Sequence, residues 1–168
     1  LAAEADAVTR LIARETGAEA ALLDEVTVTP GLEAALGAAL GEDLSLPPAE
    51  AGATGWRTLA PLSAPPPLPD GAAPLAGHVA APPALARRLA LIGVVADRSE
   101  GACLHGALAP GQRLVTANGD LWRWDGLMLD AGAARSGAER RLEQVNRLTA
   151  LTAERETADA RAHGTEQA

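Results

Sequence analysis

The chain has 168 residues, a mass of 17.0 kDa and a formal net charge of -8, which suits one domain, or two small halves, around a thin core. Every basic residue is arginine, and the lack of lysine excludes Schiff-base chemistry and a P-loop lysine. The single cysteine, Cys103, excludes an internal disulfide and a thiolate zinc cluster and favours a reducing cytoplasm.

Membrane and targeting signals are missing from the sequence. No stretch approaches the roughly 20 apolar residues of a membrane span, and the acidic start lacks the basic region of a signal peptide. We therefore expect a cytoplasmic location and no membrane partner. Because the chain begins without Met and ends in a polar helical pattern, we expect a fragment of a longer protein.

Charge is distributed unevenly along the chain. Residues 1–46 carry nine carboxylates against two arginines, whereas residues 78–150 carry nine arginines against seven carboxylates. Two halves of unlike charge favour a head-to-tail, two-fold pairing of two copies. Drift in an arginine-rich sequence is an equally good explanation.

The first half is expected to span residues 17–46, after a helix end at residues 1–16. Residues 22–28 predict a short strand, because valines alternate with polar neighbours. Thr29 is expected to cap a helix that holds Pro30 in its first turn and stops at a glycine, Gly41.

Proline dominates the middle of the chain. Ten of the twelve prolines lie in residues 47–83, and a run of prolines forms neither a helix nor a central strand. We predict a surface linker, residues 47–76, with one strand around residues 56–59. A ligand for SH3-type grooves is the less favoured alternative, because no basic residue closely flanks the run.

The second half is expected to span residues 77–134. The pattern predicts a helix over residues 82–91, a buried strand over 92–96 and a short helix capped by Ser99 that ends at Leu108. Helix and strand alternate, so this half is α/β with a mixed sheet.

A hairpin follows in the second half. Asn118 and Gly119 predict a two-residue type I′ turn, which needs positive φ at both positions. The turn joins strands at residues 113–117 and 120–125, and the apolar run 127–129 comes directly after them.

The C-terminal segment predicts a long helix. Ser136 and Glu139 fit a capping box, and residues 139–162 should form a helix about 36 Å long at 1.5 Å per residue. A polar helix of this length needs a partner, which residues 1–16 can supply in antiparallel fashion.

The titratable residues form no convincing catalytic or metal-binding group. The histidines His78, His105 and His163 are too far apart for a metal site. We expect Cys103 to be a small buried residue rather than a nucleophile. Three aspartates are interpreted as turn and cap residues: Asp120, Asp125 and Asp130. The sequence thus predicts no enzyme activity, no metal and no cofactor.

Two tryptophans, Trp122 and Trp124, are two residues apart on a predicted strand and are expected to share a face. Packing in a core or interface is favoured over stacking on unpaired bases, which remains the alternative.

Two segments carry a resemblance to a known family. Residues 30–41 read PGLEAALGAALG, residues 110–126 read PGQRLVTANGDLWRWDG, and a coil helix follows. In order and separation, these segments resemble the hinge region of bacterial structural maintenance of chromosomes (SMC) proteins. The resemblance implies an α/β (α+β) domain of two halves with mixed sheets, residues 17–134, flanked by antiparallel coiled-coil ends at 1–16 and 135–168.

The resemblance also implies a function. An SMC hinge pairs with itself as a homodimer, joins two coiled-coil arms and helps to entrap or contact DNA in chromosome condensation and segregation at the nucleoid. ATP and magnesium would bind to head domains absent from this chain, and accessory subunits would bind the full-length complex. The alternatives are a small α/β enzyme domain with a helical tail and a coiled-coil adaptor that binds peptides by strand addition.

The expected sites follow from the same resemblance and from arginine density. The dimer interface is expected at Gly119, Gly126, Leu127, Leu129 and Gly132. Weak, sequence-independent DNA contacts are expected from the arginines where the second half passes into the coil, which are Arg135, Arg140, Arg141 and Arg147. A solvated coil face, in which these arginines pair with Glu139 and Glu143, is the alternative.

Overall fold

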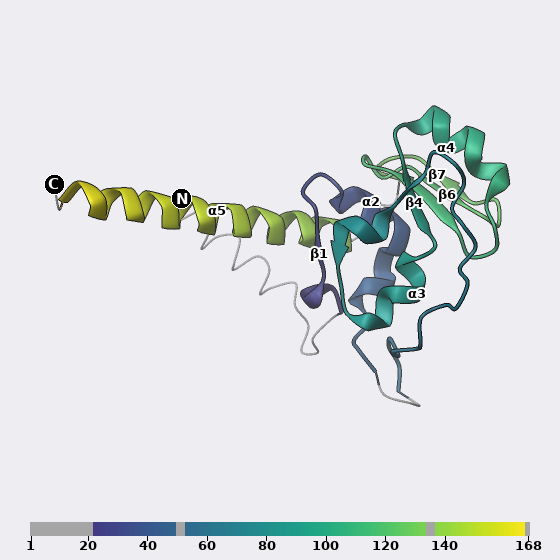
Figure 1. The fold of residues 1–168 in the computed structure, drawn as a ribbon, viewed down its shortest axis with the longest axis horizontal. Helices are drawn as coiled ribbons and strands as arrows, with labels where there is room; N and C mark the ends of the chain where they lie inside the picture. The colour runs from purple at the N-terminus through teal and green to yellow at the C-terminus, as the bar shows by residue number, and fades with distance from the viewer. Residues whose placement is uncertain (1–21, 50–52, 134–136, 167–168) are drawn as a thin grey trace.

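The computed structural model describes residues 22–49, 53–133 and 137–166, with side chains of the last segment described from 140 to 157 (Figure 1). The expected helix at residues 1–16, its antiparallel pairing with the C-terminal helix, the capping box at Ser136 and the side chain of Arg135 lie outside the described residues.

The larger of the two sheets is mixed, as predicted. A five-stranded sheet has the order β2-β4-β5-β6-β7, and a two-stranded sheet pairs β1 with β3. Only β4 and β5 run parallel, joined by a crossover helix, and the other pairs are antiparallel. The strands are β1 (Thr27–Val28), β2 (Ala73–Pro74), β3 (Val79–Ala80), β4 (Ile92–Val95), β5 (Arg113–Thr116), β6 (Leu121–Arg123) and β7 (Met128–Leu129).

The first half differs from the prediction at two points. The start of the expected strand 22–28 is a 3-10 helix, η1 (Leu22–Glu25), because Leu22 and Leu23 are both buried and period-two alternation buries only one. Helix α2 (Glu33–Leu40) begins after Pro30, since the chain turns there with a Leu32 N–H to Thr29 O bond of 3.1 Å. Its stop at Gly41 is confirmed, and the 3-10 helix η2 (Gly41–Ser45) continues from it.

The proline-rich segment is irregular but anchored. The predicted strand at 56–59 is reduced to a single bridge between Pro48 and Trp56. The fully buried Gln112 donates from Nε2 to Pro66 O at 3.1 Å and to Pro67 O at 2.9 Å. This amide therefore holds the proline run against the second half.

The helices of the second half are shorter than predicted. The expected helix 82–91 consists of one 3-10 turn, η4 (Pro83–Leu85), and one α turn, α3 (Ala86–Leu89). A further 3-10 helix, η3 (Leu75–His78), lies before it. Helix α4 (Arg98–Leu104) is capped by Asp97, which accepts from the Glu100 N–H at 2.9 Å, so the predicted cap at Ser99 is wrong. The 3-10 helix η5 (His105–Ala107) follows.

The hairpin is confirmed, but its turn type is wrong. Gly119 has φ +93°, and no described residue other than glycine has positive φ, so Asn118 is not left-handed. The Gly119 N–H donates to Thr116 O at 3.0 Å, and the Thr116 hydroxyl donates to Asp120 Oδ2 at 2.7 Å. These bonds close a longer turn, which needs only one residue with positive φ.

The core lies on both faces of the larger sheet. The main cluster joins α2, β4, β5 and β6 and includes Leu36, Ile92 and Leu121. A smaller cluster beneath α4 contains Val95, Leu114 and Trp122. Neighbouring residues of β6 thus face opposite sides, as the pleat requires.

Two expectations about burial are wrong. Trp124 does not share the face of Trp122, because β6 ends at Arg123 and Trp124 lies in the following turn, 49% exposed. Cys103 is exposed rather than buried, because α4 turns Gly101 toward the sheet, where its backbone contacts the Trp122 ring.

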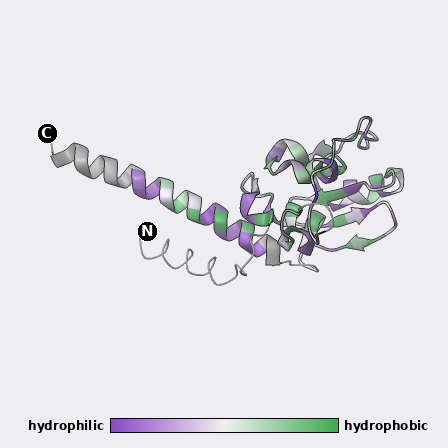
Figure 2. Ribbon diagram, turned by 90° about the horizontal axis from the view of Figure 1, so that it is seen from below, coloured by the Kyte–Doolittle hydropathy of each residue, from purple (hydrophilic) through white to green (hydrophobic). Residues whose placement is uncertain are grey.

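The long C-terminal helix α5 (Gly137–Glu166) has 30 residues, about 45 Å at 1.5 Å per residue, and exceeds the predicted span of 139–162. It extends away from the sheets, and Figure 2 shows polar residues along much of its described length. Its base is apolar on one side, where Leu142 and Leu151 are buried. Among the described helices, none combines the length and apolar character needed to cross a bilayer.

Candidate functional site

An exposed apolar strip marks the edge of the five-stranded sheet. Strand β7 is the last strand of the sheet order and pairs only with β6 in the described part of the chain. Trp124, Leu127 and Met128 are 49%, 39% and 50% exposed along this edge. Open strand edges with exposed apolar residues pair readily with another chain.

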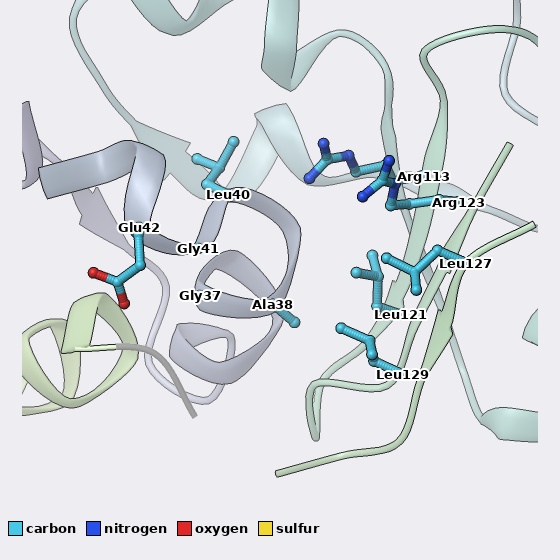
Figure 3. A pocket seen from close by; sticks show the side chains of 10 residues that line it. All are labelled: Gly37, Ala38, Leu40, Gly41, Glu42, Arg113, Leu121, Arg123, Leu127 and Leu129. Atoms are coloured by element: carbon cyan, nitrogen blue, oxygen red, sulfur yellow. The ribbon is translucent and has the colours of Figure 1, made fainter. Parts of the chain in front are cut away.

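A cavity of about 300 Å³ lies between this edge and α2. Leu121, Leu127 and Leu129 form one wall, and the C-terminal part of α2 forms the other (Figure 3). Arg113 and Arg123 lie at one end of the cavity. The cavity therefore presents an apolar floor with a positively charged end.

The arginines at this end are held by fixed partners. Arg113 donates to Ala39 O near the C-terminal end of α2, and Arg123 forms an ion pair with Asp125. Burial, together with the guanidinium groups of Arg88 and Arg123, lowers the pKa of Arg113 to about 10. These positive charges are crowded, and a pKa of about 10 leaves Arg113 protonated at neutral pH.

A second open edge lies on the proline-rich segment. The Trp56 N–H donates to Pro47 O and Trp56 O accepts from the Ala49 N–H, both at 2.9 Å, so this side of the segment is occupied. In the described structure, the N–H groups of Arg57, Thr58 and Leu59 have no backbone partner. Leu59 is also 46% exposed, so residues 57–59 combine an exposed apolar side chain with backbone groups that have no backbone partner.

A groove of about 600 Å³ adjoins residues 57–59. Its apolar surface comes from Trp56, Leu59, Leu62 and Leu91, and arginines lie around it. These arginines are Arg57, Arg87 and Arg88. The second edge is therefore apolar with a basic surround, whereas the carboxylates that flank β7, Asp125 and Asp130, are paired with Arg123 and Arg98.

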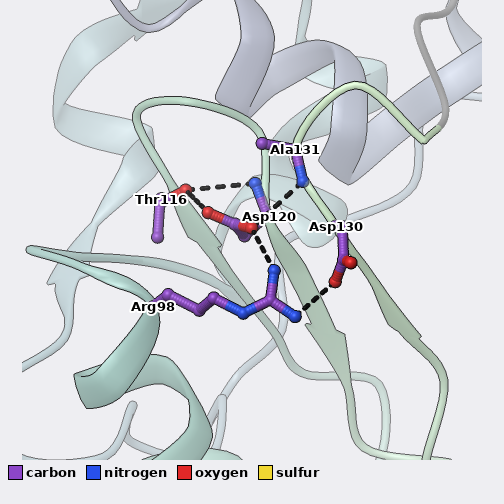
Figure 4. A network of polar contacts seen from close by, with 5 residues as sticks. All are labelled: Arg98, Thr116, Asp120, Asp130 and Ala131. Atoms are coloured by element: carbon purple, nitrogen blue, oxygen red, sulfur yellow. Dashed lines mark hydrogen bonds and ion pairs between the residues drawn. The ribbon is translucent and has the colours of Figure 1, made fainter.

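A polar network joins the residue before β6, Asp120, to the residues after β7, Asp130 and Ala131 (Figure 4). Arg98 Nη1 donates to Asp120 Oδ1 at 3.1 Å and also pairs with Asp130. The Ala131 N–H donates to Asp120 Oδ1 at 3.0 Å. Burial alone would raise the pKa of Asp120, but the bonds from Thr116 and Ala131 and the charge of Arg98 outweigh it and lower the pKa.

We expect Asp120→Asn to lower the free energy of unfolding by about 1–3 kcal/mol at pH 7, because it leaves buried donors without a charged acceptor. A carboxyl whose pKa is lower in the folded state stabilises the fold above its unfolded pKa, about 3.9. This contribution disappears as pH falls through the folded pKa, so the difference from the parent should shrink below about pH 4. Urea unfolding at pH 7 and pH 3 measures both effects.

The matched control is Asp130→Asn, because Asp130 pairs with the same arginine but its side chain is 68% exposed. Exposed ion pairs contribute only about 0–1 kcal/mol. Equal losses at the two positions would contradict the role assigned to the buried carboxylate.

The three glycines expected at the interface lie in different surroundings. Gly126 precedes β7 and has open space around its Cα, with φ +92°. Gly119 instead faces α2, where an added Cβ would lie 3.3 Å from Ala34 O. Gly132 lies in the turn after β7, beside a polar cavity of about 400 Å³ that also contacts Gly31 and Glu143.

The two leucines predicted at the interface lie at the β7 edge of the sheet. Leu127 is exposed at the edge, and Leu129 is half-buried in the cavity wall. Sequence reasoning omitted Met128 and residues 57–59. The apolar run 127–129 contained the signal for Met128, and the strand expected around residues 56–59 was the signal for the second segment.

The arginines expected to contact DNA also differ in their surroundings. Arg140 and Arg147 are exposed on α5. Arg141 is 8% exposed, and its Nη2 lies 2.6 Å from Asp24 Oδ1. Arg141 therefore contacts the first half of the domain.

No metal site can be assembled from the part of the chain that the structure describes. There, no group of three or more His, Cys, Asp or Glu side chains is placed to hold a metal ion. His105 Nε2 lies 2.8 Å from Arg123 O, a structural contact between η5 and β6.

Comparison with known proteins identifies relatives of the chain. It is 51% identical over 163 residues to the chromosome partition protein Smc of Cereibacter sphaeroides, covering 96% of this chain and 14% of that protein. It is 42% identical over 147 residues to the protein of the same name from Rhodopseudomonas palustris, covering 88% of this chain and 13% of that protein. The chain thus spans about one seventh of the length of these relatives. A scan against protein-family models found no match.

Solved structures show the same fold. An asymmetric dimer of the Geobacillus stearothermophilus SMC hinge domain aligns with a TM-score of 0.66 and 20% identity, covering 98% of this chain and 77% of that one. The Pyrococcus furiosus SMC hinge domain aligns with a TM-score of 0.52 and 14% identity, covering 80% and 90%. The chain is therefore a homologue of one segment of chromosome partition protein Smc, and its fold is that of the SMC hinge domain.

Proposed function

We propose that this chain is the homodimerisation hinge of a chromosome-partition ATPase that acts on the nucleoid in the cytoplasm. It joins two coiled-coil arms, of which α5 is the beginning of one. The observation that carries the proposal is the pair of open edges within one chain, at β7 and at residues 57–59. The proposal assigns no catalytic step to the chain, and ATP with magnesium would act on head domains elsewhere in the protein.

The two edges suit each other. One offers the exposed side chains of Leu127 and Met128, and the other offers Leu59 and an apolar groove. If β7 of each copy pairs with residues 57–59 of the other, a two-fold axis repeats the contact twice and closes the dimer. The same pairing satisfies open backbone groups and covers both apolar surfaces.

Light scattering on the parent chain at micromolar concentration tests the proposal. We expect a mass of twice 17.0 kDa. A mass of 17.0 kDa under these conditions would show that the chain does not dimerise and would favour an adaptor that binds other peptides through its open edges.

DNA contact is the second part of the proposal. Arg140 and Arg147 are seven residues apart and exposed, so they lie on nearly the same face of α5. Arginine suits phosphate because its planar group donates two parallel hydrogen bonds. With a net charge of -8, the chain should bind DNA weakly and without sequence preference.

We expect the double variant Arg140→Gln and Arg147→Gln to weaken DNA binding at low salt. Each lost phosphate contact should reduce the slope of log affinity against log salt by about 0.9 on duplex DNA. Fluorescence anisotropy over a range of salt measures this slope. The control is Ala102→Glu with Ala107→Glu, which changes the net charge equally at exposed positions of α4 and η5. Identical curves for both double variants would remove these arginines from the DNA-binding surface.

A further inference from the structure

The base of α5 is packed against the first half of the domain, more than a hundred residues earlier in the sequence. Helix α5 contacts α2, η2 and β1. Leu142 of α5 is buried within the main core cluster. The arm therefore begins inside the domain rather than on its surface.

A shielded ion pair fixes one point of this contact. The distance of 2.6 Å joins Arg141 Nη2 to Asp24 Oδ1, and the two side chains are 10% and 26% exposed. An ion pair with so little solvent is screened weakly by salt. Arg141 thus holds α5 to η1, the first described element of the chain.

Asn146 fixes a second point, five residues along α5. Its Nδ2 donates to Val28 O at 3.1 Å and to Glu33 Oε1 at 2.5 Å. Glu33 in turn accepts from the Gly31 N–H through Oε2 at 2.7 Å. One amide therefore links α5 to β1 and to the first turn of α2.

The segment that precedes α5 is held from the other half. Ala131 and Asp130 are bound to Asp120 and Arg98, as described above. The described chain is thus attached to the second half just before α5 and to the first half along the base of α5. A helix held at several points over its first turns has one direction relative to the domain.

We infer that Arg141 and Asn146 are positioning residues that set the direction in which the arm leaves the domain, and that the guanidinium of Arg141 serves this contact rather than a nucleic acid. All the contacts lie within one chain, so the inference goes beyond dimerisation and does not depend on it. Direction matters because α5 is a lever: tilting a helix about 45 Å long by about 10° moves its far end by roughly 8 Å.

Pulsed electron paramagnetic resonance tests the inference by measuring the distance between α5 and the first half. Spin labels are attached at Ser45→Cys and Ala153→Cys, both exposed positions, in a Cys103→Ser background. Labelled chains are diluted into an excess of unlabelled chains, so that each measured distance lies within one chain. Near-ultraviolet circular dichroism of the tryptophans reports whether each variant keeps its fold.

We expect a single narrow distance distribution in the parent. In Arg141→Gln and in Asn146→Ala, we expect a broad distribution. Arg141→Lys, which keeps the charge that pairs with Asp24, should retain the narrow distribution. So should the matched control Arg140→Gln, because Arg140 is exposed. A narrow distribution in all variants would overturn the inference, as would a broad one in Arg140→Gln. If Arg141→Gln does not fold, Asn146→Ala alone decides the outcome, since it removes two hydrogen bonds and no charge.

Discussion

Replacing Trp122 by alanine should lower the free energy of unfolding by about 3–5 kcal/mol, the range found when a large buried aromatic side chain is truncated. Trp122 is 1% exposed and forms the smaller core cluster with Val95 and Leu114. On its other side, an added Cβ on Gly101 would lie 2.4 Å from the ring, so the backbone of α4 is in direct contact with it. Leu104 of α4 and Leu108 also pack against this cluster.

Trp124→Ala is the matched control, because it removes the same side chain two residues away at a position 49% exposed. We expect a change within about 0.5 kcal/mol for the folded monomer. Urea unfolding at several protein concentrations measures both variants. The part of the unfolding free energy that comes from dimerisation depends on protein concentration, whereas the part that comes from a core residue does not. Similar losses for the two tryptophans, independent of concentration, would contradict the placement of Trp122.

Met128→Glu should convert the dimer into monomers. Met128 is 50% exposed on β7, so the variant should fold, but pairing with a second chain would bury an unpaired carboxylate. Such a charge costs about 3–5 kcal/mol, which corresponds to a hundredfold or greater loss of affinity. Leu59→Glu should have the same effect from the opposite edge. Analytical ultracentrifugation of each variant measures the loss.

The control for these charge changes is Ala102→Glu, at an exposed position of α4 that belongs to neither edge. It adds the same charge and should remain dimeric. Dimers of Met128→Glu would exclude β7 from the interface, and monomers of Ala102→Glu would show that net charge alone drives dissociation.

Local patterns predicted the elements whose stabilising contacts are close in sequence. The strand at β4, the hairpin of β5 and β6, and the stop of α2 at Gly41 all follow from apolar runs and glycines within a few residues. The start of α2 and the cap of α4 were misplaced, because adjacent residues compete for these roles. Asp97 caps α4 although Ser99 is an equally suitable residue type two positions later.

The candidate site, too, was predicted only where the signal lies within a few residues in the sequence. The apolar run at Leu127 and Leu129 identified the edge of the sheet, and the resemblance to SMC hinges is confirmed by relatives and by fold. The surroundings of Arg141 could not be predicted, because its partner Asp24 is 117 residues away. Arginine density gives the number of positive charges on α5 and says nothing about which of them face the domain.

Sedimentation equilibrium of an equimolar mixture of the Met128→Glu and Leu59→Glu chains tests the central claim most directly. Each variant alone has one damaged edge, so every contact in its homodimer pairs a damaged edge with an intact one, and we expect a mass of 17.0 kDa. In the mixture, β7 of the Leu59→Glu chain and residues 57–59 of the Met128→Glu chain are both intact. One full contact can therefore form, and a species of twice 17.0 kDa should appear. A mixture that remains monomeric at every concentration, while the parent is dimeric, would contradict the pairing of β7 with residues 57–59.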